Sequence, residues 1–414
     1  MISTLLALTV GGSCAPVVTA IRDYAPDFVV FIVSTGSRGS RSMVDGQGKP
    51  CSAEDRTPLP NILEQTGLPD DKYAFIELDD PDTLHLCYQK IHDGLSKHTT
   101  ERADWRKIAD YTGGTKTMTA ALILAALQLG WELSVVRGDR TDLLKVRDGT
   151  EMASLVNTWE VRARQQLELA ETLFNQYAYS SAEKLAENLV RAAPLSPELQ
   201  REIQRFVTLS RGFDAWDRFD HARAAQILAP YQAEIVPHWK FLKILTGQSK
   251  GTGYEPVFDL IRNAERRAAR GRYDDAVARL YRALEMLAQI RLKQREPSLD
   301  SSDLKLDLLP ENVRQAYANR QGKIKLGLLE DYDLLNALGD PLGKSFASER
   351  GKILATIEKR NASILAHGTQ PCDETIYREV HSEILRLLEQ GLSALGVRVD
   401  GPQFPRMQAG RIHS

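Results

Sequence analysis

Apolar runs alternate with amphipathic stretches over the first third of the chain. Residues 4–10 and 28–34 are continuous, β-rich apolar runs, and such runs are typical of strands buried on both faces of a parallel sheet. Residues 15–24, between them, fit a short crossover helix. The same criteria predict further strands and helices, at residues 73–78, 108–111 and 131–137 and at residues 82–95 and 116–129. Strands that alternate with helices predict an open, mostly parallel α/β sheet over residues 1–150.

The rest of the chain has apolar positions at helical spacing. Residues 151–250 are predicted to form an all-α connector whose spacing is similar to that of a single tetratricopeptide unit. The glycine-rich stretch 247–253 is the best domain boundary. Residues 251–398 are predicted to form an α-helical bundle, and residues 399–414 are expected to be a frayed tail.

The stretch 257–294 is predicted to be one long helix at the start of this bundle. Its first half carries a run of arginines, namely Arg262, Arg266, Arg267, Arg270 and Arg272. Such a run fits contact with an RNA backbone, and it fits a solvated basic face equally well. The sequence leaves both interpretations open.

Small and hydroxyl-bearing residues follow three of the predicted strands. They are Gly11, Gly12 and Ser13 after the first strand, Ser34, Thr35, Gly36 and Ser37 after the second, and Thr112, Gly113, Gly114, Thr115, Lys116 and Thr117 after the fourth. A Rossmann-like sheet binds ligands outside the carboxyl ends of its strands, and glycine loops at helix N-termini favour anions. Glycine and serine also make tight turns, so each loop alone fits either interpretation. Three such loops at one edge favour a phosphate-binding site.

Two common phosphate-binding motifs are absent from these loops. A Walker A loop needs glycine immediately before its lysine, whereas Thr115 precedes Lys116. The loop that begins at Gly11 lacks the three-glycine dinucleotide fingerprint. The sequence therefore disfavours both an NTPase and a nicotinamide-dependent enzyme.

Arg360 and His367 lie at the end of a predicted helix that starts near residue 345. Seven residues make about two helical turns, so the two side chains share one face about 10 Å apart. In one interpretation Arg360 reaches to water and His367 stabilises the helix C-terminus. In the other, both lie at a helix–helix interface as a phosphate-binding and proton-transfer pair. Arg406 and His413 have the same spacing, but no helix is expected to hold them together in the Pro- and Gly-containing tail.

Composition excludes some functions and leaves others open. The formal charge of −2 provides no overall attraction to nucleic acid, so RNA contact requires a local patch. The four cysteines, Cys14, Cys51, Cys87 and Cys372, show no metal-ligand spacing and are expected to be reduced structural residues of a cytosolic protein. No apolar stretch is long enough to span a membrane. The apolar start lacks a basic n-region and is predicted to be a strand.

Two motifs resemble known families. The segment DYTGGTKTMTAAL at residues 110–122 resembles the ligand-binding loop and following helix of CARF domains. Arg360, Asn361 and His367 resemble the Arg-x(4–6)-His motif of HEPN ribonucleases, including the polar residue that follows the arginine. Together the two ends of the chain resemble a CARF–HEPN ribonuclease of type III CRISPR defence, of the Csm/Csx class of accessory effectors. The middle is matched only by being helical.

This resemblance implies a cyclic oligoadenylate activator and a single-stranded RNA substrate. It implies ligand contacts from Gly11, Gly12, Ser13, Thr112, Gly113, Gly114, Thr115, Lys116 and Thr117, with Thr35 and Gly36 as additions. It also implies a cytoplasmic homodimer that uses neither metal nor cofactor. His367 would be the general acid and base, Arg360 would stabilise charge on the phosphate, and Asn361 would orient one of them.

Other functions remain open at this stage. The chain could be a non-catalytic nucleotide sensor whose helical half dimerises or binds a partner. The sensor loops could also cleave the cyclic ligand slowly. No helix-turn-helix pattern is evident, which disfavours a DNA-binding regulator.

Overall fold

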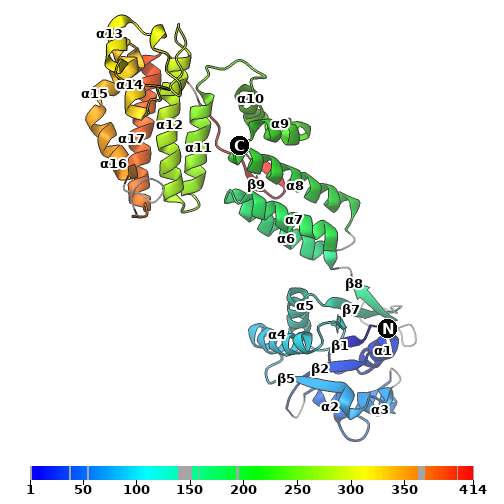
Figure 1. Cartoon of the computed structure of the whole chain (residues 1–414). Coiled ribbons are helices and arrows are strands. Elements are labelled where there is room, and N and C mark those ends of the chain that lie inside the picture. The colour runs from blue at the N-terminus through cyan, green and yellow to red at the C-terminus, as the bar shows by residue number, and fades with distance from the viewer. Residues whose placement is uncertain are drawn as a thin grey trace. The chain divides into compact units, whose positions relative to one another are not determined.

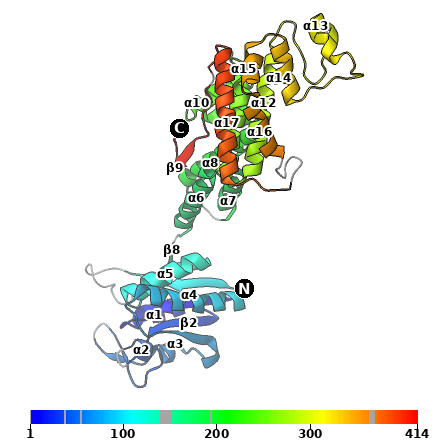
Figure 2. The same ribbon diagram turned by 90° about the vertical axis from the view of Figure 1, so that its left-hand side faces the viewer.

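A computed structural model describes residues 2–36, 39–53, 56–138, 152–156, 158–192, 195–361, 369–398 and 400–413, with the side chains of residues 192, 356, 357 and 359–361 left out. The chain forms two compact units, Met1–Ala163 and Arg164–Ser414 (Figure 1, Figure 2). None of the described helices is long and apolar enough to cross a membrane.

The first unit is built on a six-stranded sheet of order β5-β2-β1-β6-β7-β8. The strands are β1 (Thr4–Thr9), β2 (Phe28–Ser34), β5 (Tyr73–Leu78), β6 (Arg106–Asp110), β7 (Glu132–Arg137) and β8 (Met152–Val156). All pairings are parallel except that of β8 with β7, and β8 was not predicted. The expected Rossmann-like α/β sheet is confirmed.

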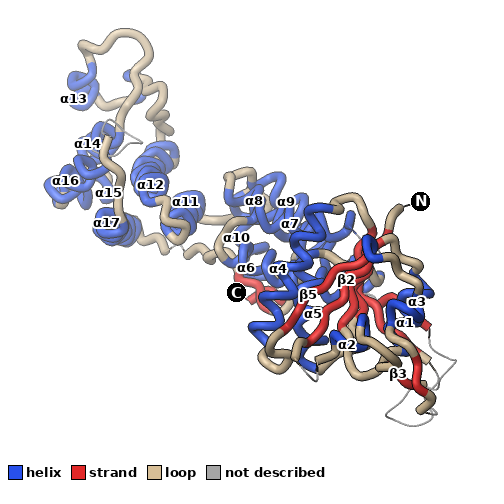
Figure 3. The backbone as a smooth tube through the Cα atoms, turned by 90° about the horizontal axis from the view of Figure 1, so that it is seen from below, coloured by secondary structure: helices blue, strands red, loops and turns tan. Residues whose placement is uncertain are grey.

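Helices cover both faces of this sheet (Figure 3). Helices α4 (Leu84–Glu101) and α5 (Lys116–Leu129) bury their apolar sides on one face, and α1 (Ala15–Tyr24) does so on the other. Because each strand is enclosed between two helical layers, β1 and β2 need apolar residues on both sides. This explains the continuous apolar runs in the sequence.

The Gly, Ser, Arg and Pro content of the segment 38–61 predicts a long surface loop, and that prediction is wrong. It contains α2 (Arg41–Asp45), β3 (Cys51–Ser52) and β4 (Pro58–Leu59), and α3 (Ile62–Thr66) and a 3-10 turn (Asp70–Lys72) follow it. Val44 and Cys51 join the core beneath α1. A disulfide links Cys51 to Cys14 at the start of α1, so the expectation of four reduced cysteines is also wrong. Cys87 and Cys372 are both buried.

The second unit is almost entirely helical. Its first part contains α6 (Trp159–Asn175), α7 (Tyr179–Ala192), α8 (Pro197–Asp217), α9 (His221–Leu228), a 3-10 turn (Ala229–Tyr231) and α10 (Val236–Leu245). Its second part contains α11 (Glu255–Ala268), α12 (Tyr273–Lys293), α13 (Glu311–Arg314), α14 (Leu328–Ala337), α15 (Pro341–Ser348), α16 (Arg350–Asn361) and α17 (Glu374–Ala394), with 3-10 turns at Leu306–Leu308 and Gln315–Tyr317. The helical connector and bundle of the predicted fold are thus present.

Two predicted long helices are each divided in the structure. The stretch 257–294 is interrupted between α11 and α12, where Gly271 has a φ of +69° that favours glycine. The stretch 345–359 is interrupted between α15 and α16. Apolar periodicity continued across both turns, so the pattern alone did not reveal them.

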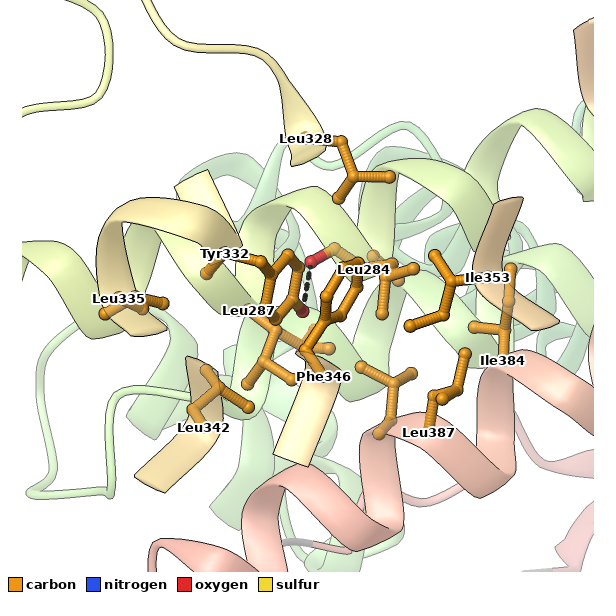
Figure 4. Close-up of a cluster of buried hydrophobic side chains, with 14 of the residues drawn as sticks. Leu284, Leu287, Leu328, Tyr332, Leu335, Leu342, Phe346, Ile353, Ile384 and Leu387 are labelled. Carbon is orange, nitrogen blue, oxygen red and sulfur yellow. Dashed lines mark hydrogen bonds between the residues drawn. The ribbon is translucent and has the colours of Figure 1, made fainter. Parts of the chain in front are cut away.

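The bundle has a close-packed core (Figure 4). The ring of Tyr332 stacks on that of Phe346 with centroids 3.7 Å apart. The Tyr332 hydroxyl donates a hydrogen bond of 2.9 Å to the backbone oxygen of Leu284. Ile353 of α16 and Ile384 of α17 are buried in the same cluster. This packing fixes α16 against α12 and α17.

Two arginines of the run, Arg266 and Arg267 of α11, are internal. Arg266 is only 1% exposed and donates a 2.7 Å hydrogen bond to the carboxylate of Asp217 in α8. Arg267 pairs with the same carboxylate, and Asn263 donates to it as well. These residues hold α11 against α8. For Arg266 and Arg267, both sequence interpretations, RNA contact and a solvated face, are therefore wrong.

The C-terminal tail is folded and not frayed as expected. It ends in a hairpin of β9 (Arg406–Gln408) and β10 (Arg411–His413), and β9 lies beside α6 and α8 (Figure 2). Phe404 is buried among the rings of Tyr179, Phe213 and Trp216. The aromatic partners lie far away in sequence, so the local Pro and Gly content was misleading.

The Asp217 pairing predicts a large stability effect. Asp217→Ala would leave the buried Arg266 and Arg267 charges without their carboxylate, and we expect a loss of about 3–5 kcal/mol in the unfolding free energy of the second unit. Urea denaturation of the full chain would measure it. Glu198→Ala is the control on the same helix, because Glu198 pairs with Arg201 in solvent, and it should cost no more than about 1 kcal/mol. Equal losses would contradict this role of Asp217.

Candidate ligand-binding and catalytic sites

The loops after β1 and β6 meet at the carboxyl edge of the sheet. β1 lies between β2 and β6, and the chain leaves β1 toward α1 on one face and β6 toward α5 on the other. This reversal is the place where open α/β sheets bind ligands. The Thr9 hydroxyl donates a 2.6 Å hydrogen bond to the backbone oxygen of Gly113, which joins the two loops.

Three of the predicted ligand-binding glycines are needed for contact between the loops. A Cβ atom on Gly11 would lie 2.7 Å from the backbone nitrogen of Gly114, and one on Gly113 would lie 2.3 Å from the backbone oxygen of Thr9. Gly114 has a φ of +83°, which favours glycine. By contrast, a Cβ on Gly12 would meet nothing within 4 Å. Gly12 and Ser13 are exposed at this edge.

The hydroxyls of Thr112 and Thr115 are also engaged within the fold. Thr112 Oγ1 accepts a 2.7 Å hydrogen bond from the backbone N–H of Val136. Thr115 caps α5, because its Oγ1 accepts from the Met118 N–H at 3.2 Å and donates to the Pro81 oxygen at 2.8 Å. These two threonines shape the loop that begins α5.

Lys116 and Thr117 occupy the first turn of α5. Lys116 is exposed and forms no ion pair or hydrogen bond with any residue that the structure describes, and Thr117 is half-buried. The first N–H groups of a helix lack internal partners and carry partial positive charge. The start of α5 therefore combines a free ammonium group with N–H donors, and this combination suits a phosphate.

The loop after β2 lies on the other side of β1. The Thr35 hydroxyl donates to Asp79 at 3.2 Å, and Asp79 also pairs with Lys90. Gly36 is exposed with a φ of +92° and open space around it. The Ser34 and Ser40 side chains exchange hydrogen bonds with each other's backbone N–H, which closes this loop. Ser37 lies outside the described residues.

Asp110 is a structural residue of this edge that the sequence analysis did not single out. It is 2% exposed and accepts hydrogen bonds from the Thr112 N–H at 3.1 Å and from Ser134 Oγ at 2.7 Å. The Tyr24 hydroxyl donates to Ser134 in turn. Burial raises the pKa of Asp110. An aspartate directly after an apolar strand and before a Thr-Gly-Gly turn was the available sequence signal.

The Arg-x(4–6)-His motif lies mostly outside the described residues. The backbone of Arg360 and Asn361 forms the last turn of α16, whereas their side chains and His367 are not described. The chain resumes next to α12, where the Cys372 N–H donates to Asp274 at 3.1 Å. The segment just before α17 is thus held at the start of α12.

The bundle also contains a buried carboxylate, Asp331 of α14. It is fully buried and accepts a 2.5 Å hydrogen bond from the Ser301 hydroxyl. Its other oxygen has no hydrogen-bond partner among the described residues. Burial, as the main cause, raises the pKa of Asp331 to about 7.

Comparisons with known proteins cover both units. Residues 248–390 match the family model described as "Csm6 HEPN domain", and residues 163–250 match "Csm6 6H domain". The structure is similar to that of Enterococcus italicus Csm6 bound to cyclic hexa-2'-fluoro-hexa-dAMP, with a TM-score of 0.60, 12% identity and coverage of 96% of this chain and 95% of that chain. Can2 from Sulfobacillus thermosulfidooxidans in complex with cyclic tetra-adenylate matches with a TM-score of 0.24 and 14% identity, over 55% of this chain and 68% of that one. A search of curated proteins found no match.

An α/β sensor domain followed by a 6H domain and an HEPN bundle defines a CARF–HEPN effector of type III CRISPR systems. The chain belongs to the Csm6 family. The resemblance inferred from the two ends of the sequence is thereby confirmed, and the middle of the chain proves to be the 6H domain of this family.

An added methyl group should destabilise the fold at Gly113, which is packed against backbone, and have little effect at Gly12, which is open. Gly113→Ala forces a Cβ against the Thr9 backbone, so we expect a loss of about 1–3 kcal/mol in stability of the first unit. Gly12→Ala places its Cβ in open space and should change stability by less than about 0.5 kcal/mol. Calorimetric unfolding of the full chain would compare them. Equal melting temperatures would contradict the assignment of Gly113 to loop packing.

The raised pKa of Asp331 predicts a pH-dependent stability. The folded-state pKa of about 7 lies above the ordinary value of 3.8. The stability that the protonated carboxyl contributes is therefore fully present below about pH 4 and is lost as the pH rises toward 7. Asp331→Asn removes the titration. The unfolding free energy of the variant, relative to that of the wild type, should therefore rise by roughly 2–3 kcal/mol from pH 5 to pH 8. Urea unfolding at both pH values would measure the gain. A difference that stays constant with pH would contradict the raised pKa.

Proposed function

We propose that this chain is a cyclic-oligoadenylate-activated, metal-independent endoribonuclease that cuts single-stranded RNA in type III CRISPR antiviral defence. The observation that carries the proposal is the Csm6 HEPN match over residues 248–390, which includes Arg360, Asn361 and His367 at the motif spacing. The proposal places the protein in the cytoplasm as a homodimer. In the dimer the motifs of two chains meet across a two-fold axis and form one composite site.

The activator binds at the carboxyl edge of β1, β2 and β6. Lys116 and the first N–H groups of α5 contact a phosphate, since both are available for an anion. Gly12, Ser13 and Gly36 are exposed around them and contact the ring, as does Thr117 beside Lys116. Gly11, Gly113 and Gly114, with Thr112, Thr115 and Thr35, hold the loops in position and contribute ligand contacts through their backbone.

The RNA supplies its own nucleophile in the proposed reaction. The 2′-hydroxyl attacks the adjacent phosphorus, the new 2′-O–P bond forms, and the bond to the 5′-oxygen breaks. His367 acts as general base for the 2′-hydroxyl proton and as general acid for the leaving oxygen. Arg360 stabilises the charge that develops on the phosphate, and Asn361 orients one of the two side chains. The products carry a 2′,3′-cyclic phosphate and a 5′-hydroxyl, and no metal is required.

Cleavage of a fluorescent single-stranded RNA in EDTA tests this function. We expect cyclic tetra- or hexa-adenylate to activate the wild type, and His367→Ala to lower the rate by roughly 100- to 10,000-fold. Lys116→Gln should raise the activator concentration needed for half-maximal rate by about 10-fold, because it removes a charged contact worth about 1–2 kcal/mol, and leave the saturated rate unchanged. Lys72→Gln is the control, since Lys72 is an exposed lysine remote in sequence from the predicted ligand loops.

The results would separate the alternatives. Silence of the wild type with every activator would favour a non-catalytic sensor. Cleavage that persists in His367→Ala would place the reaction on other residues. Equal activation of Lys116→Gln and Lys72→Gln would remove Lys116 from the activator site.

A further inference from the structure

The outward face of the C-terminal hairpin carries a compact group of basic side chains. In the register of β9 and β10, His413 is paired with Arg406, and Arg411 is paired with Gln408. Side chains alternate between the two faces of a strand, and Met407 occupies the buried face. Arg406, Arg411 and His413 are therefore exposed together, and we refer to these three residues as the hairpin face.

The side chains of the hairpin face are unpaired in the described part of the chain, although Glu171 and Glu202 lie beside Gly410 at its turn. None of its three residues forms an ion pair or hydrogen bond with the residues that the structure describes, unlike Arg205 and Arg211 of the same unit, which pair with glutamates. Like charges that face each other across two strands destabilise a sheet. An anion from outside would offset the positive charge that Arg406 and Arg411 bring to this face.

The hairpin is held firmly from beneath. The side chain of Asn175 bonds both the N–H and the oxygen of Met407, at 2.7 Å each. At the turn, Glu171 accepts from the Gly410 N–H at 2.6 Å, and Arg205 donates to the Gly410 oxygen at 2.8 Å. A preorganised surface loses less entropy when a ligand binds. The hairpin thus presents its basic side chains from a fixed backbone.

We infer that the hairpin face binds the phosphate backbone of single-stranded RNA, as an accessory contact outside the catalytic site. Arg411 and His413 are two residues apart on β10, so their Cα atoms are separated by about 7 Å, which is of the order of one step between phosphates in an extended strand. Apart from the imidazole of His413, the face holds no exposed ring for base stacking, and contacts with phosphates carry no base-sequence information. This inference rests on the proposed function, because it takes RNA as the substrate.

A binding assay with the full chain tests the inference. In a His367→Ala background, which prevents cleavage, fluorescence anisotropy would give the Kd for a 20-nucleotide oligouridylate at several salt concentrations. The combined variant Arg406→Gln, Arg411→Gln and His413→Gln should raise Kd by roughly 10-fold or more. The slope of log Kd against log salt should fall by about 1.4, since each of the two lost arginine contacts with a single strand contributes about 0.7.

A matched variant controls for the loss of charge. Arg223→Gln, Lys240→Gln and Lys250→Gln together remove three exposed cations of the same unit that form no ion pair with described residues. This control should leave Kd and the salt slope near those of the parent protein. Circular dichroism melts of both variants should match the parent, because all six positions are exposed.

The outcomes distinguish this inference from the proposed function. If the wild type cuts RNA and the two triple variants bind oligouridylate equally, the inference is overturned and the proposed function stands. If the wild type neither binds nor cuts RNA, both fall. Selective loss of binding to a fluorescent decaglutamate, with RNA binding intact, would assign the face to an acidic protein segment and overturn the inference.

Discussion

The arrangement of the helical unit depends on one buried carboxylate, Asp217. It ends α8 of the 6H domain and receives Arg266 and Arg267 from α11 of the HEPN domain. The ring of Phe404 lies 3.6 Å from the Arg266 guanidinium carbon, so the tail covers the same ion pair. A buried charge is tolerated only when it is paired and hydrogen-bonded. Because the partners come from the 6H domain, the HEPN domain and the tail, satisfying one charge joins all three, and residues 164–414 form a single compact unit.

The packing within each unit bears on how the first unit could control the proposed catalytic site in the second. The proposed catalytic motif begins in the last turn of α16, and Ile353 of this helix is buried in the core around Tyr332 and Phe346. In the sensor unit, glycine contacts and the Asp110 network fix the loops around the start of α5. The start of α5 and helix α16 are therefore each supported by packed structure. In the proposed activation, cyclic oligoadenylate acts only through states of the protein that it binds with different affinities.

The sequence was most informative where a residue pattern reflects local structure. The apolar runs of β1 and β2 and the helix α5 were predicted correctly, because burial on two faces and capping by Thr115 leave local signals. The pairing of Arg266 with Asp217 was not predictable, since its partner is 49 residues away. The folded tail was missed for the same reason, because Phe404 is held by rings from α7 and α8. At the carboxyl edge of the sheet, the sequence alone could not show that Gly12 has open space around it whereas Gly113 is packed against backbone.

The central claim is that this chain cuts RNA through its own arginine and histidine, with the 2′-hydroxyl as nucleophile. Mass spectrometry of the RNA fragments produced in EDTA with cyclic oligoadenylate examines that chemistry directly. The account predicts fragments that end in a 2′,3′-cyclic phosphate and begin with a 5′-hydroxyl, and none from an RNA whose 2′-hydroxyls are replaced by fluorine. Fragments with 3′-hydroxyl and 5′-phosphate ends would contradict it, because an external water would then be the nucleophile.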